Sequence, residues 1–208
     1  MKWFLPLLAA FLLVGCTAQP SGESSESASE PGNSLEYHMQ TAPQPDCPFL
    51  FAEENTPIYG IPFDSPENGT ISNQLVQVFA NVYGGECPDC GESGPWALIN
   101  WGIFDSAVDT TCWVCTCHLR PYTAEDAEII TYPVKVRDGV AVTIREKETS
   151  SADLSEARVS SRTDAEITLN WVGGDSCTLP LSDVLVPDPE LVGQMKTDPA
   201  DWKALFAP

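Results

Sequence analysis

The chain has 208 residues, 30 Asp and Glu against 10 Lys and Arg, and a formal net charge of −20. After Lys2 no basic Lys or Arg occurs before Arg120, whereas fourteen Asp and Glu lie between those two positions. A surface this negative repels nucleic acid and other phosphate polymers, so the composition excludes a nucleic-acid partner. The negative charge of this surface either keeps the protein soluble or attracts cations or a basic partner.

The N-terminus combines a cationic start, Met1-Lys2, with an apolar run from Trp3 to Val14. This run is shorter than the roughly 20 residues of a membrane-spanning helix, and its length is typical of a cleaved secretory signal. Its end, Leu13-Val14-Gly15-Cys16, resembles the lipobox of bacterial lipoproteins. The resemblance implies that residues 1–15 are a signal peptide and that Cys16 is lipidated. It also implies an extracytoplasmic protein anchored to the bacterial cell membrane. An ordinary secretory signal is the alternative.

The segment after Cys16 reads TAQPSGESSESASEPGNS from Thr17 to Ser34. It lacks aromatic, aliphatic β-branched and basic residues, so it cannot bury enough apolar surface to offset its ordering entropy. We therefore expect residues 16–34 to be a disordered, lipidated tether that leaves the folded part free to meet partners.

The remaining chain predicts a mainly β fold with two small domains, 35–122 and 123–208. The boundary is placed at Arg120-Pro121, where basic residues first reappear. In the first domain, runs rich in β-branched and aromatic residues predict strands over 75–83 and 96–104.

From Thr56 to about Tyr122 the chain reads TPIYGIPF, ENGTIS, LVQVFANVY, PWALINW and CWVCTCHLRPY in order. This order resembles a bacterial SH3-like domain, with Cys112 as a departure because the family usually has glycine before the Trp-Val pair. The resemblance implies a small barrel that binds cell-wall peptides, glycans or surface proteins without catalysis. Four aromatic residues are candidates to line its ligand groove: Tyr59, Tyr83, Trp96 and Trp113. At least two of these four are expected to lie in the core instead. No catalytic residues are predicted.

Seven cysteines remain after Cys16, and outside the cytoplasm cysteines usually form disulfides. The spacing of Cys87 and Cys90 with Cys112 and Cys115 is close to that of a zinc ribbon. If 96–104 and 112–117 are antiparallel neighbours, however, Cys115 and Cys117 lie on one face near the loop of Cys87 and Cys90.

That second grouping suits two disulfides, one four-sulfur zinc site, or a reactive dithiol, and we favour the disulfides with no cofactor. Cys47 and Cys177 are candidates for a further disulfide. His118 follows Cys117 as a candidate ligand, although a structural role is favoured.

In the second domain, strands over 129–136 and 140–146 flank Arg137-Asp138-Gly139, which predicts a hairpin. A second hairpin is expected around Gly173-Gly174-Asp175, between strands over 166–172 and 176–181. Asp188-Pro189 and Asp198-Pro199 each place a capping carboxylate before a proline, which predicts two short C-terminal helices.

Overall fold

The computed structural model describes residues 40–62, 67–91, 93–102, 110–151, 154–171, 173–196 and 202–206. All of them belong to one unit, Leu35–Pro208. The predicted signal peptide, the lipidation site Cys16 and the tether lie outside the described residues. Within the described ranges, no helix has the length and apolarity needed to cross a membrane.

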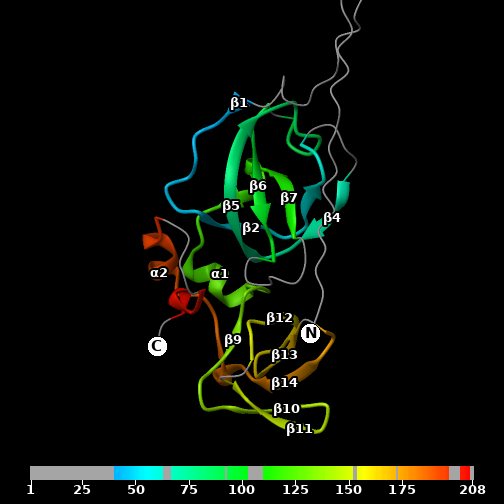
Figure 1. Cartoon of the computed structure of the whole chain (residues 1–208), viewed down its shortest axis with the longest axis vertical. Coiled ribbons are helices and arrows are strands. Elements are labelled where there is room, and N and C mark those ends of the chain that lie inside the picture. The colour runs from blue at the N-terminus through cyan, green and yellow to red at the C-terminus, as the bar shows by residue number, and fades with distance from the viewer. Residues whose placement is uncertain are drawn as a thin grey trace, which may run out of the picture. The chain divides into compact units, whose positions relative to one another are not determined.

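The first half forms one antiparallel sheet with the strand order β4-β3-β7-β6-β5-β2-β8, and β1 pairs with β5 (Figure 1). The strands are β1 Gln40–Thr41, β2 Phe49–Ala52, β3 Thr56–Tyr59, β4 Glu67–Ile71, β5 Gln74–Tyr83, β6 Pro95–Asn100, β7 Thr111–Cys115 and β8 Leu119–Arg120. The mainly β prediction is confirmed. The order does not return on itself, so the described strands form an open sheet and not the small closed barrel that we expected.

The strand expected over 75–83 is present as β5, and that over 96–104 ends at Asn100 as β6, with Phe104 outside the described residues. Alternation along β5 sends Val76 and Val78 into the core of the sheet, where they meet residues of β6 and β7. Leu75 points to the opposite side and joins a second, larger core. The first half of β5 is therefore buried on both faces.

That larger core crosses the boundary predicted at 122/123. It combines Phe49, Phe51 and Leu75 of the sheet with Val134 and Ile167 of the second half. Backbone bonds cross as well, because Leu75 N donates to Tyr132 O at 2.9 Å. The two halves thus bury their apolar side chains together.

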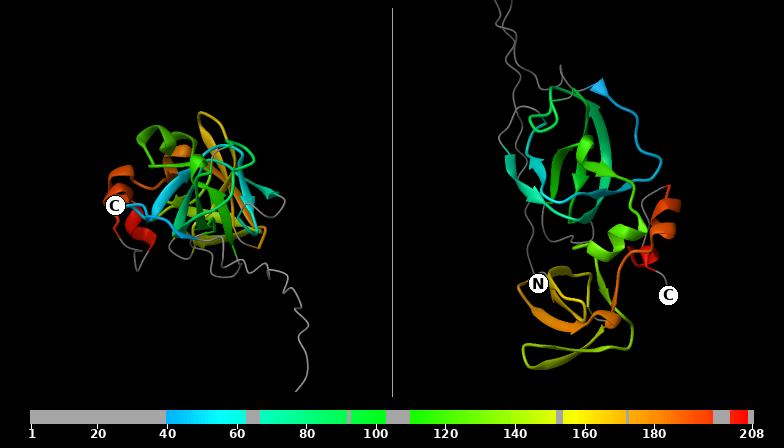
Figure 2. Two further views of the ribbon diagram at one scale, coloured as in Figure 1. Left: turned by 90° about the horizontal axis from the view of Figure 1, so that it is seen from above. Right: turned by 180° about the vertical axis from the view of Figure 1, so that it is seen from behind.

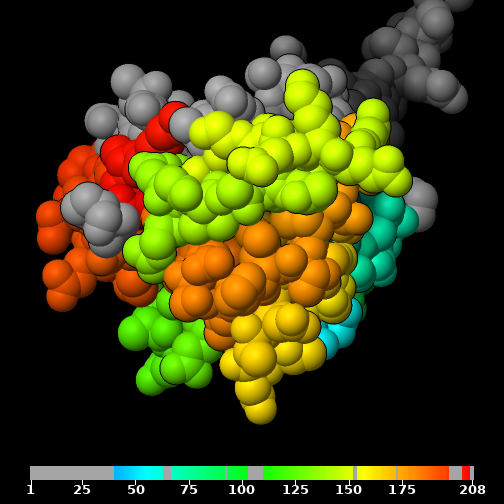
Figure 3. Space-filling view, turned by 90° about the horizontal axis from the view of Figure 1, so that it is seen from below, coloured from blue at the N-terminus to red at the C-terminus, as the bar shows by residue number. Residues whose placement is uncertain are grey.

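The second half contains three small antiparallel sheets, β12-β13-β14, β10-β11 and β15-β9. Its elements are α1 Ala124–Ile129, β9 Lys135–Val136, β10 Ala141–Ile144, β11 Lys147–Ser150, β12 Arg158–Arg162, β13 Glu166–Asn170, β14 Ser176–Pro180, η4 Leu181–Asp183, β15 Val184–Leu185, α2 Pro189–Gln194 and η5 Trp202–Leu205. On the face seen from below, the β10–β11 hairpin lies beside β14 (Figure 3), and β13 separates β14 from β12.

Two of the local predictions for this half are confirmed. β13 and β14 pair across Gly173 and Gly174, which have φ values of 98° and 85° that suit glycine. The Asp188 carboxylate accepts the backbone N–H groups of Glu190 and Leu191, which caps α2. α2 and η5 lie side by side (Figure 2), and Asp188 N donates to Leu205 O at 2.7 Å. Asp198-Pro199 lies outside the described residues.

The hairpin predicted at Arg137-Asp138-Gly139 is wrong. A turn is present, with Gly139 at φ 87°, but β9 pairs with β15 and β10 pairs with β11. The strand expected over 129–136 is also largely wrong, because Ile129 ends helix α1. The overlooked signal for this helix was Thr123, whose N–H and hydroxyl both donate to the Asp126 carboxylate at 2.8 Å.

Candidate metal centre

Four cysteines from two separate segments converge at one end of the large sheet. Cys87 and Cys90 lie in the loop between β5 and β6, Cys115 ends β7, and Cys117 lies in the 3-10 helix η2, Thr116–His118. Their four Sγ atoms all lie within 4.8 Å of one another, and the Cys90 and Cys115 sulfurs are 4.0 Å apart. The predicted grouping of these four thiols is confirmed.

Strand register explains why Cys115 belongs to the cluster and Cys112 does not. Cys115 pairs with Trp96 at the start of β6, directly after the loop that carries the other two thiols. Cys112 points to the other face of β7 and is buried in the core of the sheet. The zinc-ribbon set that included Cys112 is therefore wrong, because spacing alone does not encode the face of a strand.

Local hydrogen bonds hold the two segments in place. Gly91 N donates to Cys87 O at 2.9 Å and closes a turn, which Gly91 completes with a φ of 68°. The Thr116 hydroxyl donates to Pro95 O at 3.0 Å, which fixes η2 beside the start of β6. The indole N–H of Trp96 donates to Gly85 O at 3.2 Å and holds the start of the loop.

Half of the cluster is buried and half faces solvent. Cys87 and Cys115 are 0% and 1% exposed and pack with the rings of Tyr59 and Trp96, whereas Cys90 and Cys117 are exposed. Burial raises the pKa of the Cys115 thiol to about 12. The pKa of Cys117 is also raised, although the residue as a whole is exposed, because neighbouring protein atoms partly desolvate its thiol and the thiols of Cys115 and Cys90 hydrogen-bond to it. A redox-active thiol instead has a lowered pKa, so these surroundings weigh against the reactive-dithiol alternative.

The donor set fits a four-coordinate zinc ion. Zn–S bonds of about 2.3 Å at tetrahedral angles separate the sulfurs by about 3.8 Å, close to the observed 4.0 Å between Cys90 and Cys115. None of the candidate disulfides is formed among the described residues, and this includes a bridge between Cys47 and Cys177. Cys47 instead donates to Val192 O at 3.1 Å.

A carboxylate and an imidazole border the thiol cluster. The Asp89 carboxylate oxygen Oδ2 accepts the Tyr59 hydroxyl at 3.1 Å and lies 3.6 Å from His118 Nε2. The same oxygen lies 4.0 Å from Cys87 Sγ. His118 Nε2 is buried and has no hydrogen-bond partner. Cys87, Asp89 and His118 together form a second group of possible ligands, which shares Cys87 with the first.

The four aromatic residues expected to line a ligand groove do not share one environment. Tyr59 and Trp96 are 3% and 0% exposed and meet edge to face, with ring centroids 5.2 Å apart. These two are core residues and do not line a surface groove. Tyr83 is 46% exposed at the end of β5, and Trp113 is half-buried on β7.

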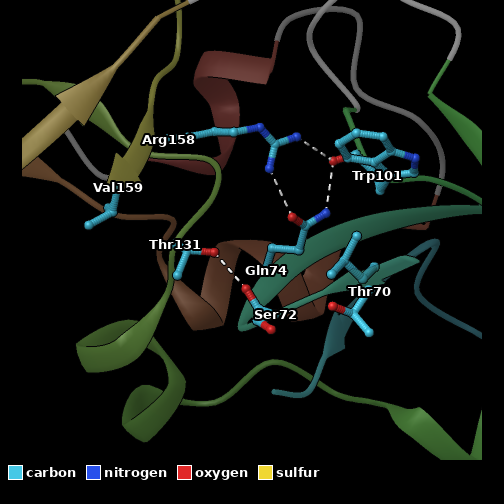
Figure 4. A pocket seen from close by; sticks show the side chains of 8 residues that line it. Thr70, Ser72, Gln74, Trp101, Thr131, Arg158 and Val159 are labelled. Atoms are coloured by element: carbon cyan, nitrogen blue, oxygen red, sulfur yellow. Dashed lines mark hydrogen bonds between the residues drawn. The ribbon is translucent and has the colours of Figure 1, made fainter. Parts of the chain in front are cut away.

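The sequence reasoning missed a hollow of about 360 Å³ where the ends of β4 and β6 meet the starts of β5 and β12 (Figure 4). The Arg158 guanidinium donates to Gln74 Oε1 at 2.9 Å and to Trp101 O at 3.0 Å, and it lies 4.0 Å from the centroid of the Tyr132 ring. Thr70 and Thr131 also line the hollow. Its residues are far apart in the sequence, so no local motif marked it.

Comparisons with protein-family models, with curated proteins and with solved structures find no match for this chain.

Proposed function

We propose that this protein binds Zn²⁺ through the thiolates of Cys87, Cys90, Cys115 and Cys117, as a structural site within a non-catalytic binding module of the bacterial envelope. The observation that carries the proposal is the convergence of the four Sγ atoms within 4.8 Å of one another. In this proposal Cys16 is the lipid anchor that holds the module at the membrane surface.

Zinc is the best-suited metal for this donor set. Thiolates are soft ligands, and a tetrahedral set of four sulfurs selects zinc or an iron–sulfur centre. Four protein ligands fill the tetrahedral coordination of Zn²⁺ and leave no position for substrate, which is typical of structural sites. Such an ion would join the loop before β6 to the end of β7, two segments that meet only through tertiary contacts.

The competing state is a pair of disulfides, which an oxidising compartment favours. Metal analysis and intact-mass measurement of the purified full chain separate the two states. We expect at least one tightly held Zn²⁺ per chain, and intense thiolate-to-metal charge-transfer absorption after replacement with Co²⁺. Cys115→Ser should abolish this absorption, whereas Cys112→Ser, a buried cysteine of the same strand outside the cluster, should retain it. A metal-free chain that has lost four hydrogens as two bridges would overturn the proposal.

A second candidate function, ligand recognition, is supported by the hollow around Arg158. Its guanidinium is held by Gln74 and by the Trp101 carbonyl, and the hydroxyl residues Thr70, Ser72 and Thr131 line the same hollow. A fixed guanidinium is suited to carboxylate groups, which are common in cell-wall peptides.

Purified bacterial cell wall should retain the full chain in a pull-down, and Arg158→Ala should weaken retention by about tenfold, the worth of one charge-assisted hydrogen bond. Arg145→Ala, which removes an arginine with a 73% exposed side chain, is the matched control and should bind normally. Equal retention of a folded Arg158→Ala protein would rule out this hollow as the wall-binding site, and no retention of the unaltered chain would rule out wall binding.

A further inference from the structure

We infer that Cys87, Asp89 and His118 form a second divalent-cation site, which shares the Cys87 sulfur with the four-thiol site. The inference rests on the proposed zinc function, because Cys87 would then bridge two ions. The four-thiol site, whose coordination is filled by protein, and a second site with three protein ligands would lie side by side at one end of the sheet.

The distances suit a common ion. Cys87 Sγ, a carboxylate oxygen of Asp89 and a ring nitrogen of His118 all lie within 4.8 Å of one another, and Asp89 Oδ2 is 4.0 Å from the Cys87 sulfur. Metal bonds of about 2.0–2.1 Å from oxygen and nitrogen at tetrahedral angles place those two atoms about 3.3 Å apart. The observed separation of Asp89 Oδ2 and His118 Nε2 is 3.6 Å, so a small movement of either side chain would bring both to one ion.

The His118 ring nitrogen supplies an independent observation. Nε2 is buried, yet it has no hydrogen-bond partner. Leaving a buried polar atom without a partner destabilises the folded state, so such atoms are rare in native structures and call for an explanation. A metal ion on Nε2 would satisfy this atom. The Tyr59 hydroxyl, which donates to Asp89 Oδ2 at 3.1 Å, would hold the carboxylate in position for the same ion.

Electrostatics favours a second cation at this place. Four thiolates around one Zn²⁺ leave a net charge of −2, and the Asp89 carboxylate adds another negative charge beside it. No Lys or Arg occurs between Lys2 and Arg120, and Arg120 itself pairs with Glu53 and Asp126. A divalent ion that shares the Cys87 sulfur would offset this negative charge.

The ligand count predicts different behaviour for the two ions. The second set has three protein ligands, which leaves a coordination position for water or an added ligand. One of these ligands, Asp89, also reaches solvent, since its side chain is 40% exposed. We therefore expect the second ion to exchange quickly and to be removed by weak chelators, while the four-thiol ion remains.

The experiment measures bound zinc per full chain after saturation and gel filtration, in the unaltered protein and in H118A and D89N. Two ions are expected in the unaltered protein, and one in each variant, with the thiolate-to-Co²⁺ absorption of the four-thiol site retained. H38A is the matched control, because His38 is the only other histidine, and it should still bind two ions.

The outcomes distinguish the two proposals. One ion in the unaltered protein, or two ions in H118A, would overturn the second site and leave the four-thiol site intact. No ion in any of these proteins, with the thiols paired as disulfides, would overturn both. Two ions that both survive a weak chelator would contradict the open coordination that we assign to the second site.

Discussion

Removal of zinc with a strong chelator should lower the melting temperature of the full chain by about 8–16 °C. An ion held at a thousandfold its dissociation constant stabilises the folded state by about 4 kcal/mol, and 1 kcal/mol shifts the melting temperature of a chain of this size by about 2–4 °C. The ion joins two segments of the sheet, so its loss frees the loop of Cys87 and Cys90 from the end of β7.

Two serine variants make this expectation specific. Cys115→Ser should have a low melting temperature with or without chelator, because the variant has lost a zinc ligand. Cys112→Ser should cost only about 1 kcal/mol for a buried hydroxyl and should still respond to the chelator. Thermal melts followed by circular dichroism measure both. A protein that is insensitive to chelator but destabilised by reductant would instead contain disulfides at this cluster.

Arg120→Met should reduce the free energy of unfolding by about 2–3 kcal/mol. Arg120 donates two hydrogen bonds of 2.6 Å to Asp126, whose side chain is only 3% exposed, and a third of 2.7 Å to Glu53. Breaking a buried ion pair costs roughly 3–5 kcal/mol, and we lower this figure because the Arg120 side chain is 39% exposed. Urea denaturation of the two proteins at neutral pH measures the difference.

The pH dependence of this loss of stability shows whether it comes from the ion pair with the Asp126 carboxylate. Burial alone would raise the pKa of Asp126, but hydrogen bonds from Arg120 and Thr123 outweigh it and hold the pKa below its usual value. A carboxylate whose pKa is lowered by folding stabilises the folded state at any pH above its unfolded-state pKa of about 3.9. This stabilisation is lost as the pH falls through its folded-state pKa. The difference in the free energy of unfolding between Arg120→Met and the unaltered protein should therefore become smaller below about pH 4. A gap that stays constant to lower pH would assign the loss to packing against the Phe51 ring, which lies 5.0 Å from the guanidinium carbon. Arg145→Met should change stability by less than about 0.5 kcal/mol.

Features coded by a few neighbouring residues could be predicted from the sequence. The apolar run of β5, the glycine turn between β13 and β14 and the Asp188 cap of α2 each depend on local propensity, and each is present as expected. The hairpin prediction failed because it assumed that strands adjacent in the sequence pair with each other. The Asp138-Gly139 turn is present, but strand pairing there is decided by β15, which lies more than forty residues later in the chain.

In the candidate site, too, some contacts could be predicted from neighbouring residues and others could not. Which thiols could meet follows from the residue pattern, since alternation along one strand separates Cys112 from Cys115 and an antiparallel neighbour returns Cys115 to the loop of Cys87 and Cys90. That Asp89 and His118 border those thiols, and that Arg158 lies over the Trp101 ring, is visible only in the folded chain. These contacts depend on how turns and sheets are placed in space, which no local pattern of residues encodes.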